Sequence, residues 1–335
     1  MAKAKGKAAK QAQRPVIGVD LGATKILAAV VSAEGRIVGK AKLTTPVAYG
    51  PKVVIDAIAD AATRAAKKAE VALDDVVAVG VGSPGPLDPE TGTVYNAPNL
   101  GWEEVALGRE LSEALGLPVA VCNDVDAGTY GEFKLGAGQG VEDLVGIFPG
   151  SGIGGGVILD GRLRTGYRGS AGEVGHTIIF ADGPVCGCGK RGCAEAVASR
   201  LAIERDIRLA VQNGRASTLA AMTDLENERI TSGVLARALE DGDRLVGEVL
   251  ARAAFYLGVL AANVVNLIDV ERVVFGGGLI EACGKWLMPG IRESAYQHFV
   301  NKRGMEQVQI VEAKLGDFAA ILGAAALARE RLAAG

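Results

Sequence analysis

The sequence predicts an α/β protein of two lobes, on the basis of its length, a repeated glycine hairpin and the alternation of strand and helix patterns. A chain of 335 residues exceeds what one hydrophobic core usually holds, so two lobes are the default. Residues 17–24 (IGVDLGAT) align without a gap on residues 145–152 (VGIFPGSG), with glycines in matching places. The chain is therefore expected to be internally duplicated, with one glycine hairpin in each half.

The first hairpin is expected over residues 16–31, where β-branched residues flank a glycine turn. Gly22, Thr24 and Lys25 would bring backbone amides, a hydroxyl and an ammonium to its tip, a combination that suits a phosphate group. Asp20, just before the turn, is placed to hold the water shell of a Mg²⁺ ion beside the phosphates. No Walker A pattern occurs in the sequence, and a glycine turn between two strands is most often only a turn.

The second hairpin is expected around residues 150–156 (GSGIGGG), so that two tips would hold a polyphosphate from both sides. This segment also matches the dinucleotide pattern G-x-G-x-x-G. A strand-like run, VILDG, follows it instead of a helix, which disfavours a nicotinamide-dependent oxidoreductase. The phosphate-binding residues expected at this tip are Gly150, Ser151, Gly152 and Gly154.

Asp124 is the candidate for chemistry in the segment between the hairpins. It follows a short buried strand over residues 119–122 and opens a helix through residues 126–133. An Asp in that place is either an N-cap, the commoner role, or a catalytic base. Two loops, at residues 82–86 and at residues 96–102 (NAPNLGW, with Trp102), are expected to face the cleft.

The stretch from His176 to Glu195 brings together one His and three Cys, which form a complete tetrahedral zinc set. Because protein atoms would fill every coordination position, the ion is expected to hold a loop in place and not to attack a substrate. Free thiols or a disulfide are the alternative. The expected ligands are His176, Cys186, Cys188 and Cys193.

Two acidic residues lie close to this metal set in the sequence, Glu173 before His176 and Glu195 after Cys193. Carboxylates on a rigid loop would accept hydrogen bonds from vicinal sugar hydroxyls, and the second ring nitrogen of His176 could donate to the same ligand. The alternative is that both carboxylates are solvated surface charges.

Composition limits the classes of function. The net charge of −3 gives no electrostatic reason to expect nucleic acid. Residues 1–14 are basic and are predicted to be a disordered tail without the apolar centre of a signal peptide. The longest apolar run, residues 253–268, is interrupted by Asn263 and Asn266 and predicts a buried helix, so no membrane span is expected. Clustered cysteines without a secretory signal indicate the cytoplasm.

The remaining elements are read from periodicity alone. Helices are expected over residues 51–71, 107–115, 195–213, 232–240, 243–268, 279–299 and 317–332, and strands over residues 76–81 and 308–313.

Taken in order, the motifs of the chain resemble those of the ROK family of sugar kinases and repressors, and most of all its glucokinase-type members. These motifs are DLGATK, SPGP, NAPNLGW, ND, GSGIGGG, E-x-G-H, C-x-C-G-x-x-G-C-x-E and FGGG. The resemblance implies the two-lobed actin-like, ribonuclease H-like ATPase fold with a zinc-bound loop, which closes on sugar and ATP. It implies a small lobe of residues 15–124 plus 317–333, a large lobe of residues 125–316, and a homodimer.

The resemblance also implies roles for individual residues. Asp124 would be the general base for the sugar 6-hydroxyl as that oxygen attacks MgATP. The other sugar contacts would be Asn123, Glu173, His176 and Glu195, with Gly85 and Asn99 as further contacts. The glycines Gly276, Gly277 and Gly278 would lie on the adenosine side, and glucose is the expected sugar.

Three departures from the family pattern stand out: Ser151 where many relatives have Thr, Ala194 where Leu is common, and Phe148-Pro149 before the second tip. No helix-turn-helix segment precedes the first hairpin, which argues against DNA binding. Phosphorylation of mannose, fructose or N-acetylhexosamine, polyphosphate as donor, and a non-catalytic sugar sensor remain as alternatives.

Overall fold

The computed structural model describes residues 13–334, which form two compact units. Unit 1 contains the chain up to Gln139, residues Leu163–Ala171 and the chain from Asp317 on, and unit 2 contains Gly140–Arg162 and Gly172–Gly316. Each unit has a hydrophobic core of its own.

Unit 1 is built on a five-stranded sheet with the order β3-β2-β1-β4-β8. Strand β1 pairs antiparallel with β2 and parallel with β4, and β4 is parallel to β8. The strands are β1 (Val16–Leu21), β2 (Lys25–Val31), β3 (Ile37–Thr44), β4 (Val79–Ser83) and β8 (Val119–Asn123).

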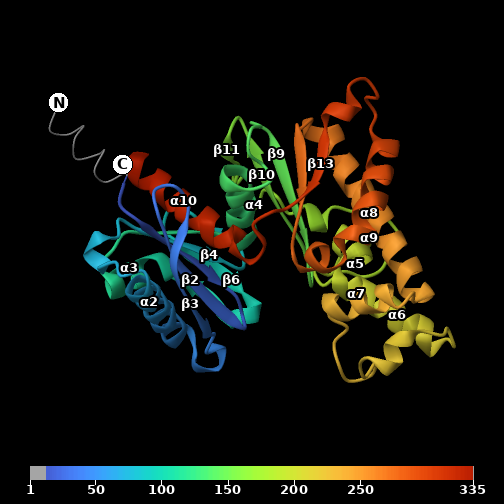
Figure 1. The fold of residues 1–335 in the computed structure, drawn as a ribbon, viewed down its shortest axis with the longest axis horizontal. Coiled ribbons are helices and arrows are strands. Elements are labelled where there is room, and N and C mark those ends of the chain that lie inside the picture. The colour runs from blue at the N-terminus through green and yellow to red at the C-terminus, as the bar shows by residue number, and fades with distance from the viewer. Residues whose placement is uncertain (1–12, 335) are drawn as a thin grey trace. The chain divides into compact units, whose positions relative to one another are not determined.

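The two faces of this sheet differ because side chains alternate along each strand. Ile17 and Val19 belong to the core that β1 shares with helix α2 (Pro51–Lys68). On the other face, helix α10 (Ala319–Ala334) lies so close that a Cβ at Gly18 would stand 2.1 Å from the Ile321 carbonyl oxygen. Glycine is thus required on the α10 side of β1 (Figure 1).

The rest of unit 1 contains two further helices, a small antiparallel sheet and short 3-10 turns. Helix α4 (Asp124–Leu135) packs along α10. The other elements are α3 (Leu107–Leu115), the small antiparallel sheet β5 (Leu87–Asp88), β6 (Thr93–Ala97) and β7 (Trp102–Val105), and 3-10 turns at Val47–Tyr49, Leu73–Asp75, Pro98–Leu100 and Gly316–Phe318.

Unit 2 repeats the sheet of unit 1, with the order β11-β10-β9-β12-β13. Its first strand again pairs antiparallel with the second and parallel with the fourth. The duplication predicted from the two glycine hairpins is therefore confirmed in the topology. The strands are β9 (Leu144–Pro149), β10 (Ile153–Leu159), β11 (Arg162–Leu163), β12 (Arg272–Phe275) and β13 (Gln309–Glu312).

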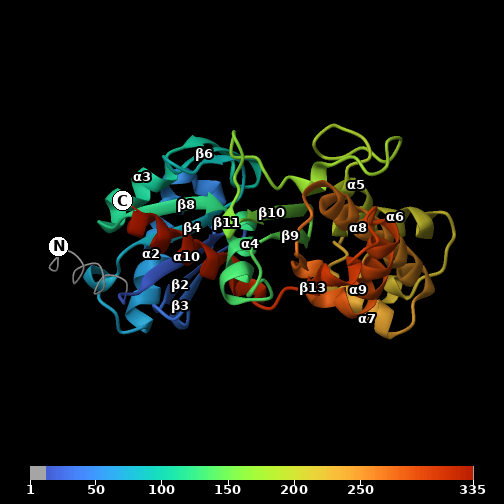
Figure 2. The ribbon, with the colours of Figure 1, turned by 90° about the horizontal axis from the view of Figure 1, so that it is seen from above.

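Helices supply most of the core of unit 2 (Figure 2). They are α5 (Ala194–Ala198), α6 (Arg200–Gln212), α7 (Ser232–Glu240), α8 (Arg244–Ile268) and α9 (Gly278–His298), with 3-10 turns at Val174–His176, Thr218–Ala221 and Met305–Gln307. The helix predicted over residues 195–213 is divided at Ser199, whose side chain caps α6 by accepting from the Ala202 amide.

Helix α8 is long and apolar enough to cross a membrane by length and composition, but 61% of its apolar window is buried inside the unit. Its buried side chains, Leu250, Leu257 and Leu260 among them, belong to the core of unit 2. This agrees with the buried helix predicted over residues 253–268.

The described chain differs from the expected boundaries in two places. Residues 1–12 of the expected tail lie outside the described residues, while Arg14 is held by the backbone, since its Nε donates to the Asp75 carbonyl over 2.9 Å. Residues 125–139 and 163–171, expected in the large lobe, group with unit 1. For the first segment the reason is the packing of α4 against α10.

Candidate functional site

The tip of the first hairpin is a closed turn fixed by a neighbouring segment. The Gly22 amide donates to the Lys25 carbonyl over 2.9 Å, which closes the turn between β1 and β2. Thr45 then holds the tip twice: its hydroxyl donates to the Gly22 carbonyl over 2.6 Å, and its amide donates to the Thr24 carbonyl over 3.2 Å. These hydrogen bonds fix the backbone of the tip, as a phosphate-binding turn requires.

Carboxylates gather around this tip. Lys25 Nζ lies 2.7 Å from Asp317 Oδ1, at the start of the last segment of unit 1. Burial, and next the negative charge of Asp124, raise the pKa of Asp20 to about 6, while the Lys25 ammonium opposes that shift. A half-buried carboxylate beside a second one gains from a nearby divalent cation, so these residues fit a Mg²⁺ ion brought in with a nucleotide.

Asp124 lies at the carboxyl end of β8, as predicted, but it is not the helix cap. Asn123 caps α4, since its Oδ1 accepts from the Val125 amide over 2.9 Å and from the Asp126 amide over 3.2 Å. Asp124 is the first residue of the helix, and burial raises the pKa of its carboxyl, with a hydrogen bond from the Val125 amide as the opposing influence. The capping that was the alternative role of Asp124 therefore falls to its neighbour.

The other sugar-contact candidates of unit 1 separate into two groups. Asn123 and Gly85 are neighbours, since Asn123 Nδ2 donates to the Gly85 carbonyl over 3.4 Å. Gly85 has φ of +91° and lies so close to the Asn96 carbonyl that a side chain would not fit. Asn99 is exposed on a 3-10 turn, whereas Trp102 is 1% exposed and belongs to the core. The expectation that the whole NAPNLGW loop faces a ligand is thus wrong for Trp102.

The tip of the second hairpin is also a closed turn, but it is one residue shorter than the first. The Gly150 amide donates to the Gly152 carbonyl over 2.8 Å. The amide of Ile153, the residue after the turn, donates to Glu195 Oε2 over 3.0 Å. Ser151 is exposed at the tip. Gly154 lies within β10, paired with Phe148, so it is a strand residue behind the turn.

Arg200 is a residue of this region that sequence reasoning missed. Its side chain is nearly buried, and its Nη2 donates to the Ser151 hydroxyl oxygen over 2.9 Å, while its backbone amide donates to the Gly150 carbonyl. The sequence alone carries no clear signal for this role, because one helix was predicted from residue 195 and only the division at Ser199 places Arg200 at the start of α6.

The four predicted metal ligands converge in unit 2. One ligand atom from each of them lies within 4.8 Å of all the others. Cys186 Sγ is 3.7 Å from His176 Nδ1, and Cys188 Sγ is 3.7 Å from Cys193 Sγ. Zn–S bonds of about 2.3 Å in a tetrahedron require sulfur atoms about 3.8 Å apart, so the cluster fits a zinc ion. The disulfide alternative fails because all five cysteines are free.

Glu195 connects this cluster to the second hairpin. Its Oε1 lies 3.4 Å from Cys186 Sγ, and its Oε2 accepts from the Ile153 amide. Glu173 stands on the other side of the imidazole, with Oε2 4.0 Å from His176 Nε2. Glu173 is exposed and available to a ligand, whereas Glu195 already organises its own surroundings.

The triple glycine precedes α9 at the carboxyl end of β12. Gly277 has φ of +79° and occupies the N-cap position of α9, which begins at Gly278. A Cβ at Gly276 would stand 2.7 Å from the Phe148 ring. The unusual Phe148 thus has a structural reason: its ring packs where a side chain at Gly276 would lie, so the triple glycine and the second hairpin are fitted to each other.

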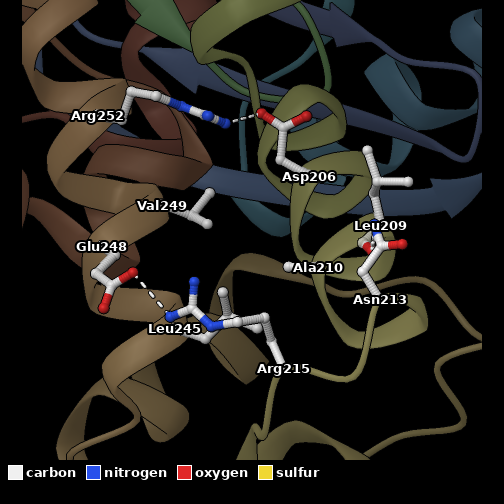
Figure 3. A pocket seen from close by; sticks show the side chains of 9 residues that line it. All are labelled: Asp206, Leu209, Ala210, Asn213, Arg215, Leu245, Glu248, Val249 and Arg252. Carbon is white, nitrogen blue, oxygen red and sulfur yellow. Dashed lines mark hydrogen bonds and ion pairs between the residues drawn. The ribbon is translucent and has the colours of Figure 1, made fainter.

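A cavity of about 370 Å³ between α6 and α8 contains none of the predicted site residues (Figure 3). Its charged groups are paired across the cavity, Arg252 with Asp206 and Arg215 with Glu248. Because these charges already neutralise one another, the cavity offers no group that calls for a ligand.

Comparison with known proteins agrees with this arrangement. Residues 16–331 match the model of the ROK family. Over 319 residues the chain is 36% identical to a glucokinase of Streptomyces coelicolor, covering 94% of this chain and 97% of that protein, and over 318 residues it is 35% identical to a glucokinase of Thermotoga maritima, covering 95% and 98%.

Among solved structures, a ROK family glucokinase from Streptomyces griseus in complex with glucose and AMPPNP superposes with a TM-score of 0.81 at 35% identity, covering 94% of this chain and 99% of that one. The α/β architecture is therefore the actin-like ATPase fold that the motifs implied. From the motifs, the repeated sheet and these similarities, we conclude that the chain belongs to the ROK family.

Proposed function

We propose that this protein is a glucokinase that transfers the γ-phosphoryl group of ATP to the 6-hydroxyl of glucose, with Asp124 as the general base. The observation that carries the proposal is the place of the half-buried Asp124 carboxyl, which lies at the carboxyl end of a parallel strand and close enough to Asp20, just before the turn of the first hairpin, to raise the pKa of Asp20. Burial raises the pKa of this group, which makes it a better proton acceptor once it is ionised.

The residues of unit 1 would perform the proton transfer. The sugar 6-oxygen forms a bond to the γ-phosphorus while the bond from that phosphorus to the β-phosphate oxygen breaks, and ADP leaves. The proton of the hydroxyl passes to Asp124. Asn123, whose Oδ1 caps α4, holds the neighbouring backbone rigid. Positioning and charge stabilisation supply most of the rate in phosphoryl transfer, so a rigid carboxylate is the main requirement.

The two hairpin tips would hold the phosphates. Gly22, Thr24 and Lys25 in unit 1, with Gly150, Ser151 and Gly152 in unit 2, offer amides, hydroxyls and one ammonium. Asp20 would hold the water shell of the Mg²⁺ ion, which neutralises charge on the phosphates when it is bound. Gly276, Gly277 and Gly278 would approach the adenosine.

The sugar would be read by Asn123 and by the loop that the metal cluster organises. The Glu173 carboxylate would accept hydrogen bonds from the other hydroxyls, and the second ring nitrogen of His176 would donate one. Glu195, Gly85 and Asn99 would be further contacts. A zinc ion on His176, Cys186, Cys188 and Cys193 would be structural, since the cluster leaves no open coordination position. The homodimer and the cytoplasmic location stay predictions.

The test is product formation with MgATP against glucose, mannose, fructose, N-acetylglucosamine and N-acetylmannosamine, repeated with polyphosphate as donor. We expect glucose with ATP to give the highest kcat/KM. A higher value for another sugar, or for polyphosphate, would contradict the assigned substrate or donor. Sugar binding seen by calorimetry without turnover on any member of the panel would favour a sugar sensor.

A further inference from the structure

A buried cation supports the exposed serine of the second hairpin. Arg200 is 8% exposed, while Ser151, whose hydroxyl oxygen accepts from Arg200 Nη2 over 2.9 Å, is exposed. These residues are 49 positions apart in the chain. The backbone amide of Arg200 also donates to the Gly150 carbonyl over 2.9 Å, so one residue holds the tip at two adjacent points.

The anchor of Arg200 is rigid. Its Nη1 donates to Glu204 Oε2 over 2.9 Å and to the Ile230 carbonyl over 3.1 Å. Glu204 is itself 8% exposed and receives a second hydrogen bond, 2.8 Å long, from Arg208. A buried guanidinium that is fixed by a carboxylate and a carbonyl has little freedom, so the Nη2 donor that reaches Ser151 has a defined direction.

The direction of this hydrogen bond determines what the serine can do. A guanidinium has donors and no acceptor, so Ser151 Oγ must be the acceptor of the contact. The hydroxyl hydrogen of Ser151 therefore points away from Arg200, and at this exposed position it can donate to a ligand. An anionic oxygen is the strongest acceptor for it, and the nearby positive charge of Arg200 strengthens that donation.

We propose that Arg200 is a positioning residue for the nucleotide: it orients the Ser151 hydroxyl as a hydrogen-bond donor to a phosphate oxygen of ATP. This inference rests on the proposed kinase function, since it names how one hairpin of that site is prepared for its donor substrate. Arg200 acts through Ser151 and is not itself required to touch the ligand.

The experiment is a double-mutant cycle on the KM for ATP with Arg200→Met, Ser151→Ala and the double variant. Each single variant is expected to raise this KM about tenfold, the loss of one hydrogen bond to a charged group, with the KM for glucose changed less than twofold. The double variant is expected to be no worse than either single one. Ser151→Thr, which keeps the hydroxyl, should restore a near-normal KM for ATP.

Arg208→Met is the matched control. It also removes a partner of Glu204 but has no contact with Ser151. A merely structural role of Arg200 would make Arg208→Met raise the KM for ATP as much as Arg200→Met does, or would make the effects of the cycle multiply, and either result would overturn the proposal. Thermal unfolding of each variant shows that the compared proteins are folded.

The outcome also separates this inference from the proposed function. Glucose phosphorylation by the unmodified protein together with a multiplicative cycle would reject only the role of Arg200. If Arg200→Met does not fold, Ser151→Ala with an unchanged KM for ATP rejects the proposal by itself. If the unmodified protein phosphorylates no sugar, calorimetry with AMPPNP repeats the cycle on binding, and absence of AMPPNP binding overturns both conclusions.

Discussion

The two glycine hairpins occupy equivalent places in their sheets but differ in what supports their tips. The first hairpin has its charges at the tip, with Lys25 paired to Asp317 and the Asp20 carboxyl beside it. The second hairpin has no charged residue between Gly150 and Gly156. Its tip is held by hydrogen bonds with the side chains of Glu195 and Arg200. One hairpin thus presents charge directly, while the other presents amides and a hydroxyl that distant residues keep in order.

This difference teaches how a duplicated element divides its work. The first tip needs little outside support because Thr45, a residue next to its own sheet, ties it down. The second tip depends on α5 and α6, which follow the predicted metal ligand Cys193 directly in the chain. The order of the second tip is therefore expected to depend on the metal ion, and that of the first is not.

The largest effect is expected at Asp124, the proposed general base beside the first hairpin. Asp124→Asn keeps the shape but removes the proton acceptor, so kcat should fall by about a thousandfold with the dissociation constant for glucose nearly unchanged. Steady-state kinetics and calorimetry measure the two quantities. Turnover at a tenth of the original rate would show that another group is the base.

The second hairpin is expected to lose its order when the predicted metal cluster is disrupted. Cys188→Ser should lose the ion and raise the KM for both glucose and ATP, since Glu195 joins the cluster to the Ile153 amide. Elemental analysis measures the zinc content, and hydrogen exchange at residues 150–153 measures the order of the tip. Cys283→Ala, at a buried cysteine of the same unit outside the cluster, is the control. One equivalent of zinc on Cys188→Ser would contradict the assigned ligand set.

An intermediate effect, on stability, is expected at Asp20. Because burial raises its pKa from 3.8 to about 6, the folded state favours the protonated form. That contribution to stability is full below the unfolded pKa and is lost as the pH rises through the folded value. Asp20→Asn should therefore be more stable than the original protein above pH 6 without magnesium or nucleotide, by at most about 3 kcal/mol. It should also lose activity.

Urea unfolding between pH 4 and 8 measures this gain for Asp20→Asn. A variant that is destabilised equally at every pH would mean that the carboxylate is held by favourable contacts and is not a cost to the fold. The contrast between the two hairpins would then no longer hold, because the charges of the first tip would stabilise it as Arg200 stabilises the second.

The smallest effect is expected at Asp317. Its contact with the Lys25 ammonium lowers the pKa of its carboxyl, but its side chain is 70% exposed. Asp317→Asn should change the free energy of unfolding at pH 7 by less than about 1 kcal/mol, and less still in high salt. Unfolding in low and high salt measures this change. A large loss of unfolding free energy that does not depend on salt would show that the first hairpin, like the second, depends on a residue distant in the sequence.

Sequence reasoning succeeded where the signal is local. The metal ligands lie within one stretch of chain, and their convergence in unit 2 is confirmed by the geometry. The two hairpins were found because each is a contiguous run of strand, glycine and strand. It was wrong about Trp102, because composition does not tell which side of a loop packs into the core.

The sequence by itself determined the duplicated α/β architecture, the cluster of one His and three Cys and the position of Asp124 at the end of a strand, because spacing and alternation along the chain encode these features. Only the tertiary structure decided that α10 lies on Gly18, that Asn123 and not Asp124 caps α4, and that Arg200 holds Ser151. These depend on which distant backbone and side-chain groups pack together, and such contacts leave no periodic signal in the sequence.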